Sequence, residues 1–575
     1  MNVVVPTLIC FVLYGLGYFF YSRFLALKLY GLNDQRVTPA HTLEDGVDYV
    51  PSRKSILFGH HFASIAGLGP LLGPAVAVIW GWVPAMIWVV LGAILIGCVH
   101  DFSALVLSIR AKGLSIAMVA EGVMGKRAKT LFHLVIFYGV GLAMGVFVFV
   151  IAKLFVVEIA PGVPGYPGAV TPSAGLIVLA LILGQLLYKK GLPLAPLAGV
   201  AFIISLLLVA MGFYFPTMGF APEQWPSMNT WIYVLLGYAL VASILPVWVL
   251  LQARDFVNSM LLYLGVAAAY IGLFVSAPTF QAPAFRPDVE GSPGILPFVF
   301  IVIACGAVSG FHGLVSSGTT AKQLNKESDA RVIGYGGMVA ESLLGLLAVL
   351  ACTAGLGSAE AWDLRYHDWA STQGLAGKIA AFINGAAFFI AGIGVPEGVG
   401  RAFIAVVVVS FALTTLDSAT RLLRYNIEEI CDTFNLQFMK NRYLSSFAAV
   451  CVIAMFAFYK VGGKPVALAL WTLFGTTNQL LGGLTLLVAT LYLRSRGKPI
   501  WFTAIPMLFM MATTCVALVI NLQKFQSGGQ TLLFVVGVML LGLAVWIVVE
   551  GVLTFRAGRK EDSLEILLEP PATGE

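Results

Sequence analysis

Long apolar segments separated by short polar ones make up most of the chain. A helix needs about 20 apolar residues to cross a hydrocarbon core about 30 Å thick. The pattern therefore predicts about 15 transmembrane helices and no sheet, which is an all-α fold. The predicted spans are residues 3–20, 62–82, 84–108, 130–157, 174–188, 195–216, 230–252, 257–277, 295–316, 332–356, 400–424, 444–460, 465–493, 499–523 and 531–555.

The span 62–82 contains residues that a membrane helix normally avoids. Within it lie Gly67, Gly69, Pro70, Gly73 and Pro74. Glycine lowers helix stability and proline removes a backbone donor. A broken backbone at membrane depth is tolerated only where it is buried in protein or lines a cavity. We expect residues 67–74 to be unwound and to form one wall of a substrate site through Gly67, Gly69, Pro70 and Gly73, the alternative being a packed kink.

Two further segments depart from a plain span. Residues 230–252 are interrupted between Ser243 and Pro246, and we expect these two residues to form the opposite wall of the site. A single proline that only kinks the helix is the simpler alternative. Residues 378–396 are long enough to cross the membrane. The distribution of basic residues is better satisfied if this segment re-enters the membrane without crossing it.

Basic residues alternate between successive loops and predict the orientation. Lys and Arg follow the first and third spans, whereas connections 158–173 and 217–229 contain none. Cytoplasmic loops are enriched in Lys and Arg, so the N-terminus is expected outside and the C-terminus in the cytoplasm. In this interpretation Arg254 is a basic residue in a cytoplasmic loop.

The order of the spans suggests internal symmetry. Five spans in 62–216 start inside, and five in 230–424 start outside, each set with an interrupted first helix. Two units of opposite topology are typical of an inverted-repeat secondary transporter. The expected organisation is an N-terminal helix and cytoplasmic loop (1–60), a transporter core (61–425), a C-terminal helical region (444–555) and a cytoplasmic tail (556–575).

Composition narrows the class of protein. The chain has 575 residues, of which 59% are hydrophobic and 11% charged, and its mean hydropathy is +0.92. These values exclude an ordinary soluble domain and indicate a multi-pass protein of the lipid bilayer. The net charge of +6 is small, so no nucleic-acid partner is expected. Seven scattered cysteines show no metal-ligand spacing, so no metal site is expected. No nucleotide-binding motif is present, so a pump driven by nucleotide hydrolysis is not expected, and we expect a secondary transporter and no enzyme.

Four stretches resemble a known family. They are GHHFASIAGLGPLLGPA (59–75), SGFHG (309–313), SFALTTLDSATR (410–421) and LFGTTNQL (473–480). They are similar to the carbon-starvation protein A family of bacterial inner-membrane transporters. The resemblance implies uptake of peptides or pyruvate and a leucine-transporter-like core of the amino acid–polyamine–cation superfamily. It implies no cofactor beyond a coupling ion, H⁺ or Na⁺, and it leaves the substrate, the ion and the oligomeric state open.

Ionisable residues inside predicted spans are candidates for ion coupling or gating, because intramembrane charges are rare and usually functional. Glu341 lies near mid-span and is the expected proton-coupling carboxylate, with Asp101 as the second choice. The alternative is that Glu341 stays protonated and only donates a hydrogen bond within the bundle. For Asp417 the simpler alternative is an ion pair with Arg421 or Arg424, since a spacing of four residues permits it. The other candidates are His60, His61, His312, Ser316 and Ser317.

Two alternatives accompany these assignments. Asn478 and Gln479 interrupt a late span and are interpreted as polar contacts between helices. A different function, a membrane oxidoreductase, would hold haem between His100, His133 and His312, because imidazoles are common axial ligands.

Overall fold

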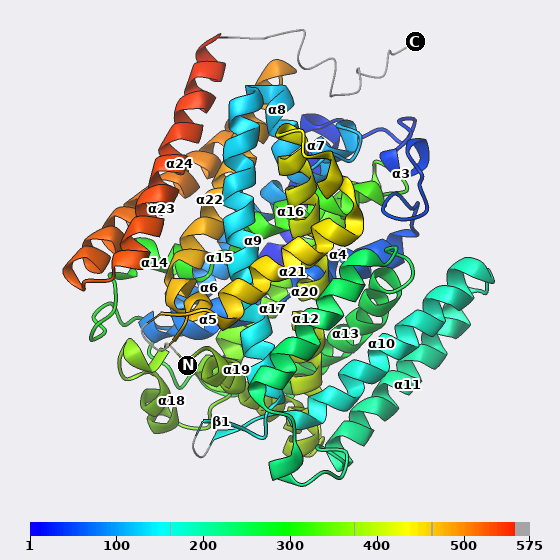
Figure 1. The fold of residues 1–575 in the computed structure, drawn as a ribbon. Coiled ribbons are helices and arrows are strands. Elements are labelled where there is room, and N and C mark those ends of the chain that lie inside the picture. Colours follow the sequence, from blue (N-terminus) through cyan, green and yellow to red (C-terminus); the bar gives the residue numbers. More distant parts are fainter. Residues whose placement is uncertain (161–162, 373, 462–463, 558–575) are drawn as a thin grey trace.

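The computed structural model describes residues 1–160, 163–372, 374–461 and 464–557, and this part of the chain is almost wholly helical (Figure 1). Met1, α18 and β1 lie at one end of the helical bundle, called here the N-terminal end. Helices α3 and α8 and the end of α24 lie at the other, called the C-terminal end. Most of the tail predicted at 556–575 lies outside the described residues.

Apolar runs fold as helices because a helix satisfies its own backbone N–H and C=O groups where no water is present. The first helices are α1 (Val4–Leu16), continued by turns at Gly17–Tyr21, α2 (Ser22–Phe24) and Leu25–Leu29, then α3 (Pro39–Thr42), α4 (Lys54–Ile65), and α5 (Gly69–Ala77) with a last turn at Val78–Trp80. They are followed by α6 (Trp82–Ile87), continued by Trp88–Gly97 into α7 (Cys98–Arg110), then α8 (Ile116–Met124) and α9 (Lys126–Phe155).

The middle of the chain contains a turn at Pro167–Ala169, α10 (Val170–Gly184) continued by Gln185–Lys189, α11 (Leu194–Tyr214), a turn at Pro222–Gln224, α12 (Met228–Ile244) and α13 (Leu251–Ser276). It ends with α14 (Ile295–Val302), α15 (Ala304–Ala307), α16 (Gly310–Gly318), turns at Thr320–Lys322 and Arg331–Tyr335, α17 (Gly336–Ala354), α18 (Ala359–Tyr366) and a turn at Ala370–Thr372.

The last part contains α19 (Leu375–Ala391), α20 (Glu397–Thr433), a turn at Gln437–Lys440, α21 (Arg442–Phe458), α22 (Val466–Ser495), α23 (Trp501–Ser527) and α24 (Thr531–Ala557). Two small antiparallel hairpins join helices, β1 (Glu158–Ala160) with β2 (Val163–Pro164), and β3 (Lys460–Val461) with β4 (Lys464–Pro465). The hairpins are too short to form a sheet layer, so the described chain is a helical membrane protein.

The helices long and apolar enough to cross a membrane are fewer than predicted. Among the described residues there are ten, or eleven if the bent pair α4–α5 is one span. Three shorter apolar helices, α12, α19 and α21, have 17 residues each. The count of 15 and the two five-helix repeats therefore stay predictions.

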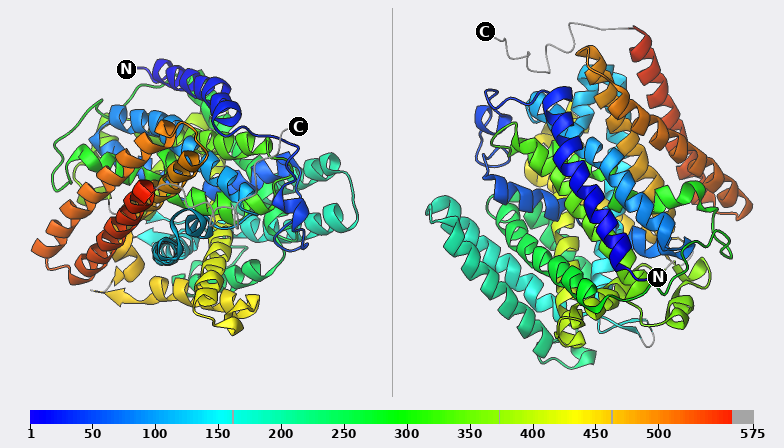
Figure 2. Two further views of the ribbon diagram at one scale, coloured as in Figure 1. Left: turned by 90° about the horizontal axis from the view of Figure 1, so that it is seen from above. Right: turned by 180° about the vertical axis from the view of Figure 1, so that it is seen from behind.

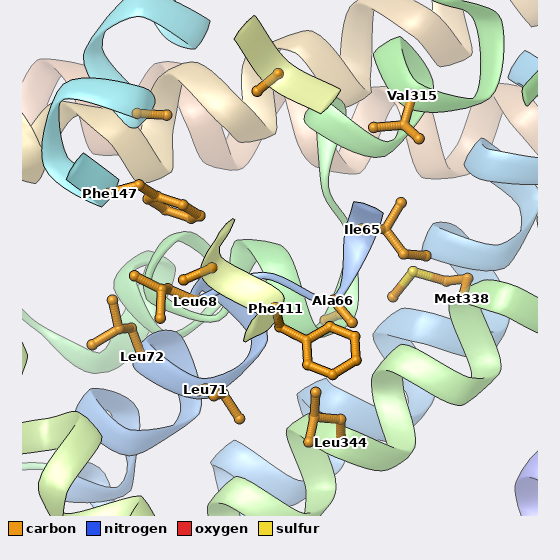
Figure 3. Close-up of a cluster of buried hydrophobic side chains, with 14 of the residues drawn as sticks. Ile65, Ala66, Leu68, Leu71, Leu72, Phe147, Val315, Met338, Leu344 and Phe411 are labelled. Carbon is orange, nitrogen blue, oxygen red and sulfur yellow. The ribbon is translucent and has the colours of Figure 1, made fainter. Parts of the chain in front are cut away.

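The expected interruption lies between α4 and α5, but it is shorter than predicted. The two helices are bent by 45° at a break over Ala66–Leu68. Only Gly67 of the expected residues lies in the break, because α5 begins at Gly69 with Pro70 in its first turn, where a proline needs no backbone donor. Apolar side chains from several helices surround the break, including Phe147, Phe411 and Met338 (Figure 3).

A second interruption occurs where a continuous span was predicted. Residues 295–316 form three short pieces, α14, α15 and α16, with non-helical backbone at Ile303 and at Val308 and Ser309. Pro70 of α5 packs against Gly306 of α15. The two interrupted helices thus lie side by side.

Helix α19 corresponds to the segment expected to re-enter. Its Gly385 packs against Gly355 after α17, and the following Gly392 packs against Gly272 near the end of α13. The chain after α13 also bonds to the N-terminus, since the Phe280 N–H donates to the Met1 carbonyl oxygen at 3.0 Å. Helix α19 therefore lies at the N-terminal end of the bundle, and its failure to cross stays a prediction.

Two helix pairs flank the bundle on different sides. Helices α10 and α11 pack together on one flank, and α23 and α24 lie on another (Figure 2). Only α23 of these four helices lines the cavity described next.

Candidate functional site

A cavity of about 360 Å³ lies between the two interrupted helices and α22–α23. We call it the break cavity. Its residues come from α5, α14, α15, the described residues just after α18, α22, α23 and the turn before α24, and they include Gly69, Gly73, Phe298, Cys305, Trp369, Trp471, Phe474, Asn521, Lys524, Phe525 and Gln530. Because Trp369 lies just after α18, the cavity lies toward the N-terminal end.

Two glycines allow the interrupted helices to approach each other at this cavity. A Cβ atom at Gly69 would lie 2.5 Å from Cys305 Sγ, and one at Gly73 would lie 2.5 Å from the Val302 carbonyl oxygen. Both distances are shorter than any normal contact, so only glycine fits at this packing. Gly69 and Gly73, two residues of the expected wall, line this cavity, and their part in substrate binding stays a prediction.

The expected opposite wall is not at this cavity. Ser243 is buried near the end of α12, where its hydroxyl donates to Ser446 Oγ of α21 at 2.7 Å, and Pro246 lies in the turn between α12 and α13. The wall that faces Gly69 and Gly73 is formed by α14 and α15. A chain reversal after α12 accounts for the proline without a binding site.

Three predicted ion-coupling residues meet in one buried group, the acid–histidine cluster. His312 Nδ1 donates to Asp101 Oδ2 at 3.0 Å, and His312 Nε2 lies 3.1 Å from Glu341 Oε2. The other oxygen of Asp101 accepts from His100 Nδ1 at 2.7 Å. All four side chains are at most 1% exposed. The cluster joins α7, α16 and α17, three elements far apart in the sequence.

The neighbouring predicted residues have separate roles. Nδ1 of His61, on α4, lies 2.9 Å from Oγ1 of Thr320, a residue just after α16. Ser317 Oγ donates to the Gly313 carbonyl within its own helix, as helix hydroxyls commonly do, and accepts from the Ile116 N–H of α8 at 3.1 Å. Ser316 is buried, and its hydroxyl has no hydrogen-bond partner among the described residues.

His60 and Asp417 belong to a second buried group, the arginine cluster. Arg254 of α13 forms ion pairs with Asp417 of α20 and with the adjacent Asp255, the latter at 3.0 Å. Asp255 also accepts from His60 Nδ1 at 2.6 Å, and Tyr238 donates to Asp417. Arg254 is only 2% exposed, so it is a buried ion-pair partner and its assignment to a cytoplasmic loop was wrong.

The expected partners of Asp417 bind elsewhere. Arg421 and Arg424 reach Asp48 in the loop before α4, at 2.7 Å and 3.3 Å. Burial raises the pKa of Asp48, but the charges of Arg421, Arg424 and Lys322 outweigh it and hold that pKa below its usual range. At the same end of the bundle Glu327 pairs with Arg36 and Arg110. These ion pairs join loops to helices at the C-terminal end.

Asn478 connects α22 to the second interruption, as the polar-contact interpretation expected. Its Oδ1 accepts from the Phe311 N–H at 2.9 Å and from Ser309 Oγ at 3.2 Å. Gln479 donates to Thr513 of α23 at 2.8 Å. These bonds satisfy backbone and side-chain groups at the break where helical bonds are lost.

The haem alternative is not supported. His100 and His312 both bind Asp101, whereas His133 pairs through Nδ1 with Asn426 at 2.9 Å. These nitrogens are engaged by protein partners, and the three rings do not form one site. Within the described ranges no group of three or more His, Cys, Asp or Glu side chains is arranged to hold a metal ion.

Apolar helices around two interrupted ones, with buried charges beside the breaks, define a polytopic helical membrane protein with an internal site. The chain belongs to the carbon starvation protein CstA family, whose model matches residues 2–366 and 365–517.

Relatives named as transporters cover most of the chain. The peptide transporter CstA of Helicobacter pylori is 32% identical, over 87% of this chain and 79% of the relative. The peptide transporter CstA of Bacillus subtilis is 30% identical, over 98% of this chain and 99% of the relative. The pyruvate/proton symporter BtsT of Escherichia coli is 30% identical, over 90% of this chain and 81% of the relative. This chain is accordingly a membrane transporter.

Among solved structures, MhsT in complex with L-phenylalanine aligns over 87% of this chain and 98% of its own, with a TM-score of 0.44 and 14% identity.

Proposed function

We propose that this transporter imports a small carboxylated carbon source, a peptide or pyruvate, across the bacterial inner membrane. The N-terminal end of the bundle faces outside and the C-terminal end faces the cytoplasm, as the basic loops indicate. The transporter is driven by an ion gradient and serves the response to carbon starvation. Support for the substrate class comes from relatives named as peptide transporters and as a pyruvate/proton symporter.

The acid–histidine cluster is the observation that carries the coupling mechanism. A carboxylate inside a membrane protein is costly and is retained for function. His312 faces Asp101 with one nitrogen and Glu341 with the other. An imidazole can donate from both nitrogens only when it carries an extra proton. A proton that arrives on Glu341 therefore changes what His312 can bind.

The position of His312 links this proton to the break cavity. His312 lies on α16, directly after the interruption whose α15 segment lines the cavity through Cys305. Protonation of Glu341 weakens its attraction to His312 and so alters how α16 is held against α17. Substrate binding at the break and proton binding at Glu341 thus act on the same interrupted helix.

The acid–histidine cluster is better able to bind protons than sodium ions. Hard cations are held by sets of free oxygen atoms. The carbonyl oxygens of Ala63 and Ser64 near the first break lie 3.2 Å and 3.1 Å from the hydroxyl oxygens of Thr414 and Thr415 and are not part of this cluster. The buried groups beside the second break are instead imidazoles and carboxylates, which exchange protons.

Reconstitution into proteoliposomes tests the function. Labelled pyruvate and a labelled dipeptide are offered under an imposed proton gradient, a sodium gradient, or neither. Accumulation of at least one substrate under the proton gradient, abolished by a protonophore, is the expected result. Accumulation that follows only sodium contradicts proton coupling, and no accumulation of either substrate contradicts the proposed substrate class.

A further inference from the structure

A charged side chain, that of Lys524, lines the break cavity. Among the described residues that line it, Lys524 of α23 is the only one with a formal charge, and no acidic side chain is present. Within the described part of the chain, the Lys524 ammonium group has no ion-pair or hydrogen-bond partner, and the side chain is exposed. A lysine at a cavity wall without an internal partner can bind an anion from solution.

The surroundings of Lys524 suit one end of an organic acid. Asn521 lies one helical turn earlier on α23, and Gln530 lies in the turn before α24, and both line the same cavity as Lys524. Trp471 and Phe474 also line it, and their rings stack with centroids 4.7 Å apart. An apolar wall with a few polar groups is typical of small-molecule sites.

We propose that Lys524 recognises the anionic group of the substrate when it enters the break cavity, and so determines the selectivity for carboxylates. This inference rests on the proposed function. The ammonium group gives a charge-assisted hydrogen bond to the carboxylate, and Asn521 adds an amide donor. The stacked aromatic pair contacts the uncharged remainder of the substrate.

An alternative role for Lys524 is structural. A lysine near the end of a membrane helix often extends its amine toward lipid headgroups while its methylene groups cover apolar surface. Such a lysine stabilises the position of α23 but does not distinguish a carboxylate from an amide. Substrate discrimination therefore separates the two roles.

The experiment measures uptake of a dipeptide and of its C-terminal amide by the full-length transporter in proteoliposomes. The variants are Lys524→Gln, Lys524→Arg, and Lys498→Gln as a matched control. Lys498 lies in the connection before α23, is exposed and does not line the cavity. Pyruvate is measured in parallel, because its carboxylate presents the same chemistry.

We expect Lys524→Gln to raise the KM for the carboxylated substrate about tenfold or more, the effect of losing a hydrogen bond to a charged group. Its preference for acid over amide should largely disappear. Lys524→Arg should keep most of the preference, and Lys498→Gln should equal the wild type.

An unchanged KM and an unchanged acid-to-amide ratio in Lys524→Gln would overturn the inference. It also fails if the wild type transports the acid and the amide equally well, a result that needs no variant. Failure of the wild type to transport any of the substrates instead contradicts the proposed function itself.

Discussion

Nε2 of His312 lies 3.1 Å from Oε2 of Glu341, and neither side chain is accessible to solvent. The pair connects α16, the last piece of the second interrupted helix, to the long helix α17. We therefore expect a change in the charge of Glu341 to act on α16, whose preceding segments α14 and α15 line the break cavity.

Close packing at Gly73 should be essential for transport. In Gly73→Ala the added methyl group would meet the Val302 carbonyl oxygen at 2.5 Å, so α5 and α14 must separate. We expect a large loss of uptake and a lower melting temperature. Gly237→Ala on α12 is the matched control, because a Cβ there meets nothing within 4 Å. Equal uptake by the two variants would show that the close approach is unimportant.

The arginine cluster should contribute strongly to stability. Asp417→Asn leaves the buried Arg254 with only Asp255 as an ion-pair partner, and breaking a buried pair typically costs about 3–5 kcal/mol. We expect a marked drop in the melting temperature in detergent. The double variant Asp417→Asn/Arg254→Gln should be less unstable than the sum of the single variants. Strict additivity would mean that the two side chains do not interact.

Asp48 should hold its loop against α20 over the whole neutral and mildly acidic range. Its pKa is below the usual value, so its contribution is complete above the unfolded pKa of about 3.9 and is lost only as the pH falls through the lower folded pKa. The protection factors for hydrogen exchange of residues 43–50, which correct for the intrinsic pH dependence of exchange, should therefore be equally high at pH 7 and pH 5. They should be low at both pH values in Asp48→Asn, and unchanged in Glu44→Gln, whose side chain is exposed. Lower protection of the wild type at pH 5 would contradict this.

Single cysteines test whether α19 crosses the membrane. Leu364→Cys before α19 and Glu397→Cys after it should react with an impermeant reagent from the same side, and Phe438→Cys after α20 from the opposite side. Leu364 and Phe438 are 76% and 63% exposed. The exposed native Cys451 is first replaced by serine. Labelling of Leu364→Cys and Glu397→Cys from opposite sides would make α19 a true crossing.

The number of helix-breaking residues explains why the sequence predicted the first interruption and missed the second. The stretch 67–74, at and directly after the first break, contains five glycine and proline residues within eight positions, a pattern that few spanning helices show. The second interruption lies at Ile303 and at Val308–Ser309, on either side of α15, and Gly306 is the only glycine or proline in residues 303–309. Its non-helical backbone is stabilised by Asn478, which is more than 160 residues away in the sequence. Such a distant partner leaves no local signal.

For the buried charges too, the sequence shows which residues are unusual but does not show what they bind. Glu341, Asp101, His312 and Asp417 stand out in the sequence because they lie within apolar spans. Their partners do not follow from spacing. Asp417 binds Arg254, 163 positions away, although Arg421 is four residues along the same helix. Lys524 resembles any interfacial lysine until the cavity beside it is known.

The most direct test of proton coupling is Glu341→Gln in proteoliposomes, compared with the wild type for gradient-driven accumulation and for exchange of internal against external substrate. Glutamine keeps the shape of the side chain but cannot take up a proton. We expect accumulation to be lost, while exchange across the membrane continues near the wild-type rate. Accumulation at the wild-type level with an unchanged pH dependence would contradict the account and would make Asp101 the next candidate.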